Sequence, residues 1–183
     1  MKATGIVRNL DNLGRVVIPK EIRRTLQIRE GDPLEIFTDK GGEVIFRKYS
    51  HMGERSRLVD AMCETLHKTT GKDTAICDRD TVIAAHVKGK SRLVDADISD
   101  ALKEVMEGRS TYRYDSSATV ELTEYGNAAV TLAVPIITAG DVMGCVVFVS
   151  DNILTENTDA PITESDTRLA LMVAEFLGQQ MEE

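Results

Sequence analysis

The chain has 183 residues and a formal net charge of −8, with 42% hydrophobic and 28% charged residues. These values are typical of a soluble globular protein with one medium domain or two smaller ones. Only 4% of residues are aromatic and none is Trp, which argues against a stacking platform for single-stranded nucleic acid. The sequence starts without an apolar signal core, and its longest apolar runs, 128–137 and 142–149, are too short to span a bilayer. We therefore expect a cytoplasmic protein with no membrane partner.

The charge is distributed unevenly along the sequence. Residues 1–50 hold ten Lys and Arg against seven Asp and Glu, a balance of +3. Residues 51–183 hold twelve against twenty-three, a balance of −11. Residues 1–29 alone carry seven basic and two acidic side chains, a balance of +5. Because a phosphate surface responds to the charge nearest to it, this first segment favours nucleic-acid binding although the whole chain is acidic.

The first part of the chain is predicted to start with a β-hairpin and a short helix. Residues 4–18 alternate in side-chain type around turn residues at 11–14 and end in a β-branched run, which is typical of a hairpin. Pro19 cannot donate to a β-ladder but suits the first turn of a helix. Apolar residues spaced four apart predict this helix over 20–26.

A second hairpin is predicted over residues 34–48, with its turn at 39–42. Four short strands and two turns of helix bury too little surface to be stable alone, and no disulfide or metal site helps them. Hairpins that are apolar on both faces also need a partner sheet. We therefore expect an obligate dimer in which two copies complete one barrel.

A polar segment at 50–56 is predicted to link this part to a second domain that contains both helices and strands. Helices are expected at 57–70, 98–107 and 163–181, and strands at 73–78, 81–87, 111–115, 119–123, 128–137 and 142–150. A loop is expected over 151–162. Thr163 and Asp166 form a capping-box-like pair at the start of the last helix.

The first and last of these helices have wide apolar faces. The main stripe of the helix at 57–70 consists of Leu58, Ala61, Met62, Thr65 and Leu66, with Val59 and Cys63 beside it. The last helix carries two adjacent stripes: Leu169, Met172, Val173 and Phe176, then Ala170, Ala174, Leu177 and Met181. Faces this wide predict helices that cover the sheet and also pair between chains.

Motifs for enzymatic chemistry are absent from the sequence. It has no Walker A loop, no G-x-S-x-G elbow and no H-E-x-x-H pair. The acidic residues between 95 and 107 have the spacing of a solvated helix surface. Cys63, Cys77 and Cys145 lie at no metal-ligand spacing and are expected to be small buried hydrophobes. We expect no catalytic residue, no metal and no cofactor.

Four arginines are the best candidates for a functional surface. Arg8 and Arg15 lie on the two arms of the first predicted hairpin, and Arg23 and Arg24 are neighbours on the short helix. An arginine can clamp a phosphate or read the O6 and N7 atoms of guanine. The alternative is that they solvate a small domain and pair locally, for example with Glu21. In a dimer eight arginines share one surface, which repels itself unless a polyanion neutralises it.

The run GIVRNLDNLGRVVIPKEIRRTLQIREGDPLEIF resembles the AbrB-type swapped-hairpin domain of bacterial transition-state regulators. The resemblance covers residues 1 to about 50 and implies that two chains interleave their hairpins into one dimeric barrel. It also implies that Arg8, Arg15, Arg23 and Arg24 contact double-stranded DNA. Members of the family often have lysines near the first hairpin, whereas this chain has Asn9 and Asn12 there.

Residues 56–181 resemble a GAF domain in the order of their helices and strands. The resemblance implies an antiparallel sheet flanked by helices and a possible small-molecule effector. The effector's cavity would be lined by residues 111–125, with Tyr112 and Tyr114, and by the loop after Asp95. The alternative is that these tyrosines only pack, because no chromophore-binding cysteine or cyclic-nucleotide signature is visible. We therefore expect an α+β chain with a swapped-hairpin DNA-binding domain at 1–52 and a GAF-like sensor and oligomerisation domain at 53–183.

The combination of the two domains is similar to a family of sporulation-stage transcription regulators. That likeness implies activation at some promoters, repression at others, a homotetramer, and a cytoplasmic, nucleoid-associated protein. One alternative is a toxin-neutralising antitoxin of the MazE type, which shares the swapped-hairpin fold but normally carries a flexible acidic tail. The other is an enzyme built on the second domain, which no residue pattern supports.

Overall fold

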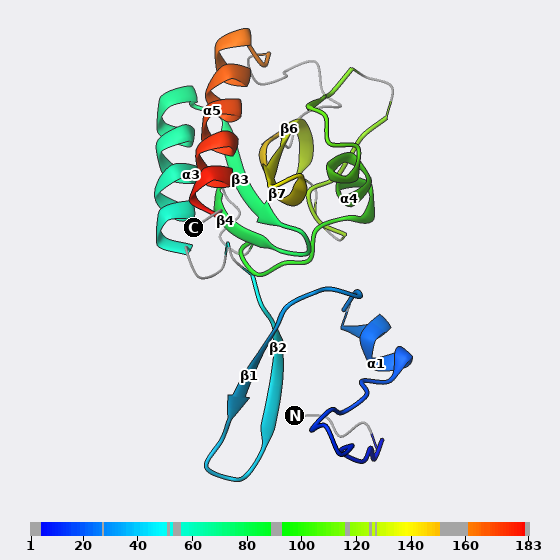
Figure 1. Cartoon of the computed structure of the whole chain (residues 1–183). Helices are drawn as coiled ribbons and strands as arrows, with labels where there is room; N and C mark the ends of the chain where they lie inside the picture. The colour runs from blue at the N-terminus through cyan, green and yellow to red at the C-terminus, as the bar shows by residue number, and fades with distance from the viewer. Residues whose placement is uncertain are drawn as a thin grey trace. The chain divides into compact units, whose positions relative to one another are not determined.

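The computed structural model describes residues 5–26, 28–50, 52, 56–88, 93–115, 118–124, 126, 128–150 and 161–181. Two compact units make up the chain, unit 1 at Met1–Tyr49 and unit 2 at Ser50–Glu183 (Figure 1). Helices and antiparallel sheets occur in both units, so the chain is of the α+β class, as predicted. Within the described residues, no helix is long and apolar enough to cross a membrane.

Unit 1 contains a short helix and a two-stranded sheet. Helix α1 (Lys20–Thr25) begins directly after Pro19, whose backbone carbonyl accepts a hydrogen bond from the N–H of Arg23. Strand β1 (Leu34–Thr38) pairs antiparallel with β2 (Val44–Lys48). The predictions of this helix and of the second hairpin are therefore confirmed.

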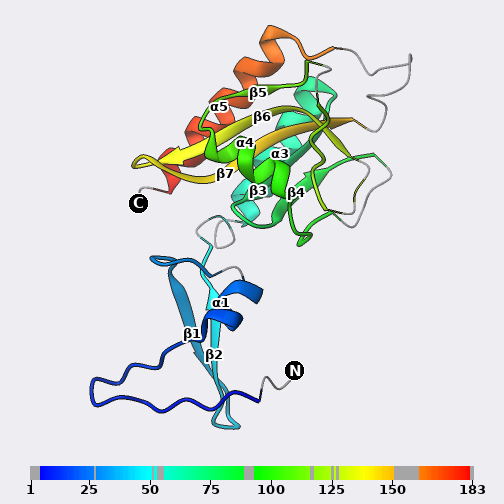
Figure 2. The same ribbon diagram turned by 90° about the vertical axis from the view of Figure 1, so that its right-hand side faces the viewer.

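The segment before α1 differs from its prediction. Residues 5–19 are not assigned to any strand, and Figure 2 shows them running out and back as an open loop. The predicted turn is present: the N–H of Asp11 donates to the carbonyl of Arg15 and the N–H of Gly14 to that of Asp11, both at 3.0 Å. The prediction of paired strands is wrong for the single chain, because neither arm of the turn is assigned to a strand.

Unit 2 is built on a five-stranded antiparallel sheet in the order β4-β3-β7-β6-β5. The strands are β3 (Asp73–Asp78), β4 (Val82–His86), β5 (Tyr112–Arg113), β6 (Ala129–Thr138) and β7 (Asp141–Ser150). All five fall within predicted strands or one residue beyond them. The predicted strand at 119–123 is wrong, because this segment makes only isolated bridges, one of them between Glu121 and Ala129.

Helices cover both faces of this sheet. Helices α3 (Ser56–Thr70) and α5 (Glu164–Gln180) lie on one face and α4 (Asp100–Glu107) on the other (Figures 1 and 2). Along β7, Val146 and Phe148 pack into the first core with α3 and α5, whereas Cys145 and Val147 pack into the second core with α4. This alternation explains why the strand reads as a continuous apolar run: both of its faces are buried.

The N-termini of α4 and α5 are capped by side chains, as their sequences require. At the start of α5, the backbone N–H of Asp166 donates to the Thr163 hydroxyl, and the N–H of Thr163 donates to the Asp166 carboxylate, at 3.1 and 2.9 Å. The predicted capping box is therefore confirmed. Helix α4 begins two residues later than predicted, because Ser99 is its cap and accepts a hydrogen bond from the N–H of Leu102.

The buried stripe of α3 is not the one that its apolar residues predict. Val59, Cys63 and Leu66 are buried against the sheet, whereas Ala61 and Thr65 are exposed. The face of α3 that packs on the sheet is thus rotated about the helix axis toward Val59 and Cys63, which lie beside the predicted stripe. A small residue and a threonine contribute little apolar area, so Val59 and Cys63 take the inward positions.

The polar segment at 50–56 does not behave as a free linker where it is described. The hydroxyl of Ser50 donates to the Asp78 carboxylate at 2.8 Å. Met52 is only 1% exposed and belongs to the first core of unit 2. Residues 51 and 53–55 of this segment lie outside the described part of the chain. The chain after Tyr49 is therefore anchored to unit 2 by a hydrogen bond and a buried side chain.

All three cysteines are buried, and we expect them to be chemically inert in the folded protein. Burial is the largest effect on Cys63 and raises the pKa of its thiol to about 12, while its Sγ donates to the carbonyl of Thr74. Since the thiolate is the reactive form, iodoacetamide at about pH 8 should label this thiol only after unfolding. Mass spectrometry of native and urea-treated samples checks this; rapid labelling of native Cys63 would contradict it.

Candidate nucleic-acid interface

Helix α1 brings two of the predicted arginines together. Arg23 and Arg24 are consecutive and exposed, so their side chains leave the helix about 100° apart. None of the residues of α1 is buried. The hydroxyl of Thr25 donates to the carbonyl of Glu21 at 2.9 Å and the N–H of Leu26 to that of Ile22, which close the last turn. This short helix therefore presents two guanidinium groups on an open surface.

The other two arginines belong to the open loop at residues 5–19. Arg8 is exposed on the arm before the turn, and Arg15 is exposed directly after it. Gly14 lies in the turn with φ 76°, a left-handed conformation that favours glycine. The turn thus fixes the backbone from which Arg15 emerges, while Arg8 stands three residues before the turn.

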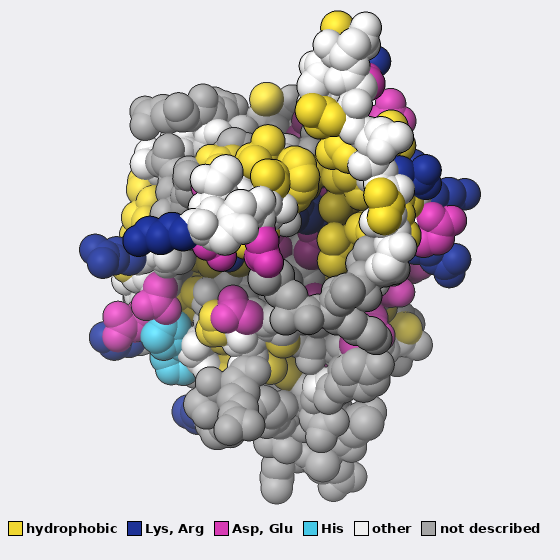
Figure 3. Space-filling model, turned by 90° about the horizontal axis from the view of Figure 1, so that it is seen from below, with side chains coloured by type: hydrophobic (Ala, Val, Ile, Leu, Met, Phe, Trp, Pro, Cys, Tyr) yellow, Lys and Arg dark blue, Asp and Glu magenta, His cyan; other side chains and the backbone are white. Residues whose placement is uncertain are grey.

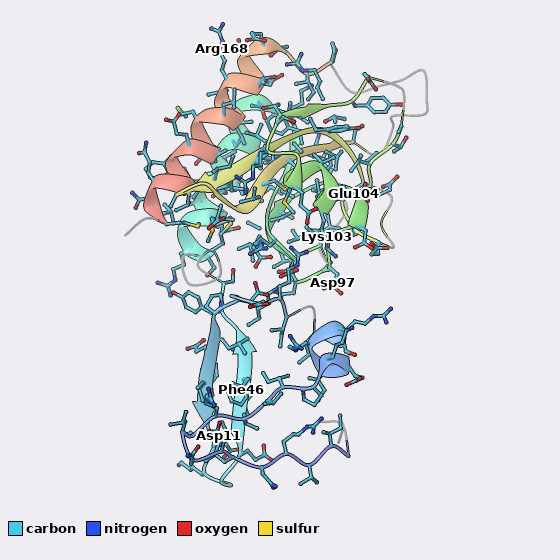
Figure 4. The ribbon with its side chains drawn as sticks, turned by 45° about the vertical axis from the view of Figure 1, so that its right-hand side comes forward. Asp11, Phe46, Asp97, Lys103, Glu104 and Arg168 are labelled. Carbon is cyan, nitrogen blue, oxygen red and sulfur yellow. The ribbon has the colours of Figure 1, made fainter. Side chains whose placement is uncertain are left out.

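Asp11 holds the turn and Arg15 together, a role that the sequence analysis missed. Its Oδ1 accepts hydrogen bonds from the backbone N–H of Leu13 at 3.0 Å and of Arg15 at 2.8 Å. Its Oδ2 accepts from Nε of Arg15 at 2.8 Å. The N–H of Arg15 and then its guanidinium hold the pKa of the Asp11 carboxyl below its usual value. The spacing Asp-x-x-Gly-Arg is the sequence signal that could have revealed this contact. Figure 4 marks Asp11 at this turn.

Unit 1 exposes much of its apolar surface. Two hydrophobic cores are present among the described residues, and both lie in unit 2. Figure 3, which views the molecule from below, shows hydrophobic side chains in yellow on that face. The large apolar side chains of unit 1 that are exposed are Ile6, Val7, Leu10, Leu13, Val16, Val17, Leu26, Ile36, Val44 and Phe46. Monomeric proteins rarely leave so many large apolar groups in water over so short a segment.

The two tyrosines of the predicted effector site lie on and next to β5. The hydroxyl of Tyr112 donates to the carbonyl of Ala118 at 3.2 Å, and the ring packs against the second core. Burial raises the pKa of Tyr112, with smaller contributions from Asp115 and Tyr114. The backbone N–H of Tyr114 donates to the carbonyl of Thr131 at 3.0 Å. Both residues thus have structural contacts of their own.

The acidic residues around α4 lie on the surface, as their spacing predicts. Asp97, Asp100 and Glu104 are exposed, and Asp100 pairs with Lys103 one helical turn later at 2.9 Å (Figure 4). Among the residues that the structure describes, no group of three or more His, Cys, Asp or Glu side chains is placed to hold a metal ion.

Family models match both parts of the chain. Residues 54–182 match the model described as stage V sporulation protein T C-terminal, transcription factor. Residues 7–53 match the model described as antidote-toxin recognition MazE, bacterial antitoxin.

Two relatives and one solved structure extend these matches. The chain is 41% identical to stage V sporulation protein T of Bacillus subtilis, over 100% of both chains. It is 61% identical to the transition state regulatory protein AbrB of Bacillus subtilis over 49 residues, which are 27% of this chain and 50% of that protein. The PixJ GAF domain of Thermosynechococcus elongatus has a TM-score of 0.55 at 13% identity, covering 74% of this chain and 89% of that one, so it shows the fold alone.

The fold and the arginine-bearing unit define a class of protein: a transcription regulator with an AbrB-type DNA-binding domain followed by a GAF-like domain. Within that class, the chain belongs to the family of stage V sporulation protein T. The resemblances expected from the sequence to the AbrB-type domain, to the GAF domain and to sporulation-stage regulators are thereby confirmed.

Proposed function

We propose that two copies of this chain join through unit 1 and bind double-stranded DNA with one shared face of arginines, to activate or repress sporulation-stage genes. The observation that carries the proposal is the open apolar surface of unit 1, where Val7 is 86% exposed. Among the described residues, both hydrophobic cores lie in unit 2 and neither includes a residue of unit 1. A second copy that interleaves its strands with these arms would cover that surface. The 61% identity with AbrB over this segment supports the same arrangement.

The proposed DNA contacts are Arg8, Arg15, Arg23 and Arg24, all exposed in unit 1. The proposed division is 1–52 for DNA binding and 53–183 for the GAF-like part, with the end of the first segment, Ser50 and Met52, packed on unit 2. The local charge supports these contacts, because residues 1–29 carry a balance of +5 while the whole chain carries −8. The proposed function uses no catalytic residue, metal or cofactor. The proposed location is the cytoplasm, in association with the nucleoid.

The GAF-like unit is proposed to pair chains into a homotetramer and to sense a small molecule. Pairing is supported by α5, which leaves Leu171, Met172 and Phe176 exposed, while Leu169 is half-buried and its other apolar residues are buried. Part of the first predicted stripe of this helix is therefore available to a second copy. Tyr112 and Tyr114 remain the candidate lining of an effector site next to the second core.

The antitoxin alternative is less well supported, although residues 7–53 match the MazE model. An antitoxin of that type normally binds its toxin with a flexible acidic tail. Here the described residues of unit 2 form a covered five-stranded sheet with two hydrophobic cores. That unit also matches the transcription-factor model over residues 54–182.

Salt dependence of duplex binding tests the proposal. If eight arginines of a dimer each neutralise a phosphate, the logarithm of the affinity should fall against the logarithm of salt concentration with a slope of about −7. Fluorescence anisotropy with labelled duplex at several salt concentrations measures the slope, and sedimentation equilibrium measures the number of chains. A monomer, or binding that hardly changes with salt, would refute the shared arginine face.

A further inference from the structure

Unit 1 contains two turns with the same backbone design. In the turn Asp11–Arg15, the N–H of Asp11 donates to the carbonyl of Arg15 at 3.0 Å. In the turn Asp39–Glu43, the N–H of Asp39 donates to the carbonyl of Glu43 at 3.1 Å. The fourth residue of each is a glycine with positive φ, 76° and 81°. In each, Oδ1 of the first aspartate accepts from the N–H two residues later. The two turns differ at their fifth residue, which is Arg15 in one and Glu43 in the other.

The first turn adds a clamp on its arginine. Oδ1 of Asp11 also accepts from the N–H of Arg15, and Oδ2 accepts from Nε of the same residue, both at 2.8 Å. One carboxylate therefore holds both the backbone and the guanidinium of Arg15. These contacts lower the pKa of the Asp11 carboxyl below its usual value, so the group that accepts from Arg15 is a charged carboxylate at neutral pH.

Fold stability does not account for this pair. The side chains of Arg15 and Asp11 are 71% and 36% exposed, and exposed ion pairs contribute little to stability. Electrostatic attraction to DNA does not account for it either, because a carboxylate beside a DNA-binding arginine repels phosphate. What the pair provides is geometry: the Nε–H of Arg15 is engaged, and the four N–H donors of the two terminal nitrogens remain for another acceptor.

We propose that Asp11 is a positioning residue that fixes the plane of the Arg15 guanidinium, so that its terminal nitrogens meet a guanine edge or a phosphate in one orientation. This inference rests on the proposed function, in which Arg15 contacts duplex DNA. Bidentate recognition requires the planar guanidinium to lie in one orientation. An arginine that rotates freely would lose conformational entropy when it takes up that orientation on binding. Asp11 thus contributes to sequence preference although its charge opposes DNA binding.

The matched turns supply the test. Asp11→Asn keeps an acceptor for the backbone N–H groups but places an amide donor against Nε of Arg15, and Asp39→Asn makes the same charge change in the turn without an arginine. Each full-length variant is titrated with two duplexes: one selected by the wild-type chain from a random library, and a shuffled one of the same composition. We expect both variants to bind the shuffled duplex slightly more tightly than wild type, because one negative charge is lost.

On the selected duplex the variants should differ. Asp11→Asn should lower the ratio of selected to shuffled affinity by about tenfold, the size of one bidentate contact, while Asp39→Asn should leave the ratio unchanged. Asp11→Glu, which keeps the charge but moves the carboxylate, should lower the ratio as well. Equal ratios for the Asp11 and Asp39 variants would overturn the positioning role.

Arg15→Ala separates this inference from the proposed function. If Arg15→Ala weakens binding while the Asp11 variants keep the wild-type ratio, only the positioning role of Asp11 fails. If Arg15→Ala leaves both affinities unchanged, the proposed contact of Arg15 fails, and the positioning role fails with it. Thermal melts that agree between Asp11→Asn and Asp39→Asn show that both variants keep the fold.

Discussion

Replacing both Arg23 and Arg24 by Ala should weaken duplex DNA binding by about a hundredfold or more at moderate salt and make the salt slope shallower by about 3 to 4. In a dimer the change removes four guanidinium groups from the proposed DNA face. Helix α1 buries none of its residues and both arginines are exposed, so unit 1 should keep its fold. Fluorescence anisotropy at several salt concentrations measures the loss, and sedimentation equilibrium should show an unchanged assembly.

The control for this double variant removes two positive charges elsewhere. Lys68 and Arg168 are exposed on α3 and α5 and pair with Glu64 and Glu164, at 2.7 and 3.4 Å. The variant Lys68→Ala with Arg168→Ala has the same net charge as the α1 variant, so an equal loss of affinity in both would mean that total charge, not the α1 surface, governs binding. An unchanged affinity of the α1 variant would exclude α1 from the DNA interface.

The elements that sequence patterns predicted well are those that a single chain completes by itself. β1 and β2 pair within one copy, and β6 and β7 are joined by the turn Ala139–Gly140 and buried on both faces. The burial and the turn that their sequences predict are therefore both supplied by the same chain. The arms at residues 5–19 carry an equally clear hairpin pattern, but no strand is assigned to them in the single chain.

Contacts that depend on tertiary packing were beyond the sequence patterns. Amphipathic spacing located α3 but not its buried stripe, since Val59 and Cys63 are buried because of the position of the sheet. Within the candidate site, arginines could be predicted from charge and residue type. Charge and residue type alone do not reveal the clamp of Asp11 on Arg15, which is a local contact within one turn. Its sequence signal is the spacing Asp-x-x-Gly-Arg, and its geometry depends on the φ of Gly14 and on two hydrogen bonds across the turn.

Gly144 is the position in unit 2 where we expect the largest loss of stability from one added methyl group. A Cβ at this position would lie 2.0 Å from the carbonyl oxygen of Cys77, 2.8 Å from Sδ of Met52 and 3.0 Å from Cα of Asp78. Two of these three atoms are backbone atoms of β3, the strand that pairs with β7 at this point. Relief of the contact therefore requires β3 and β7 to move apart, not merely a side chain to rotate.

Gly144→Ala should accordingly lower the free energy of unfolding of unit 2 by about 3 kcal/mol, the upper range for an overpacked core. Urea denaturation followed by circular dichroism measures it, with Gly108→Ala as the control. A Cβ at Gly108 would lie 3.2 Å from the carbonyl of Val105 at the end of α4, where the helix end can adjust by a small shift. A loss for Gly144→Ala no larger than for Gly108→Ala would show that β3 and β7 separate easily.

The same substitution should also affect the segment that follows the DNA-binding unit. Sδ of Met52 lies against Gly144, and two residues earlier Ser50 donates to Asp78, the residue opposite Gly144 on β3. A methyl group at 144 would therefore displace Met52 and Asp78, which anchor the chain directly after Tyr49. We expect protease cleavage near residues 50–56 to become faster in Gly144→Ala at urea concentrations where unit 2 is still folded. Unchanged cleavage there, together with lower stability, would mean that this anchor does not depend on the packing at Gly144.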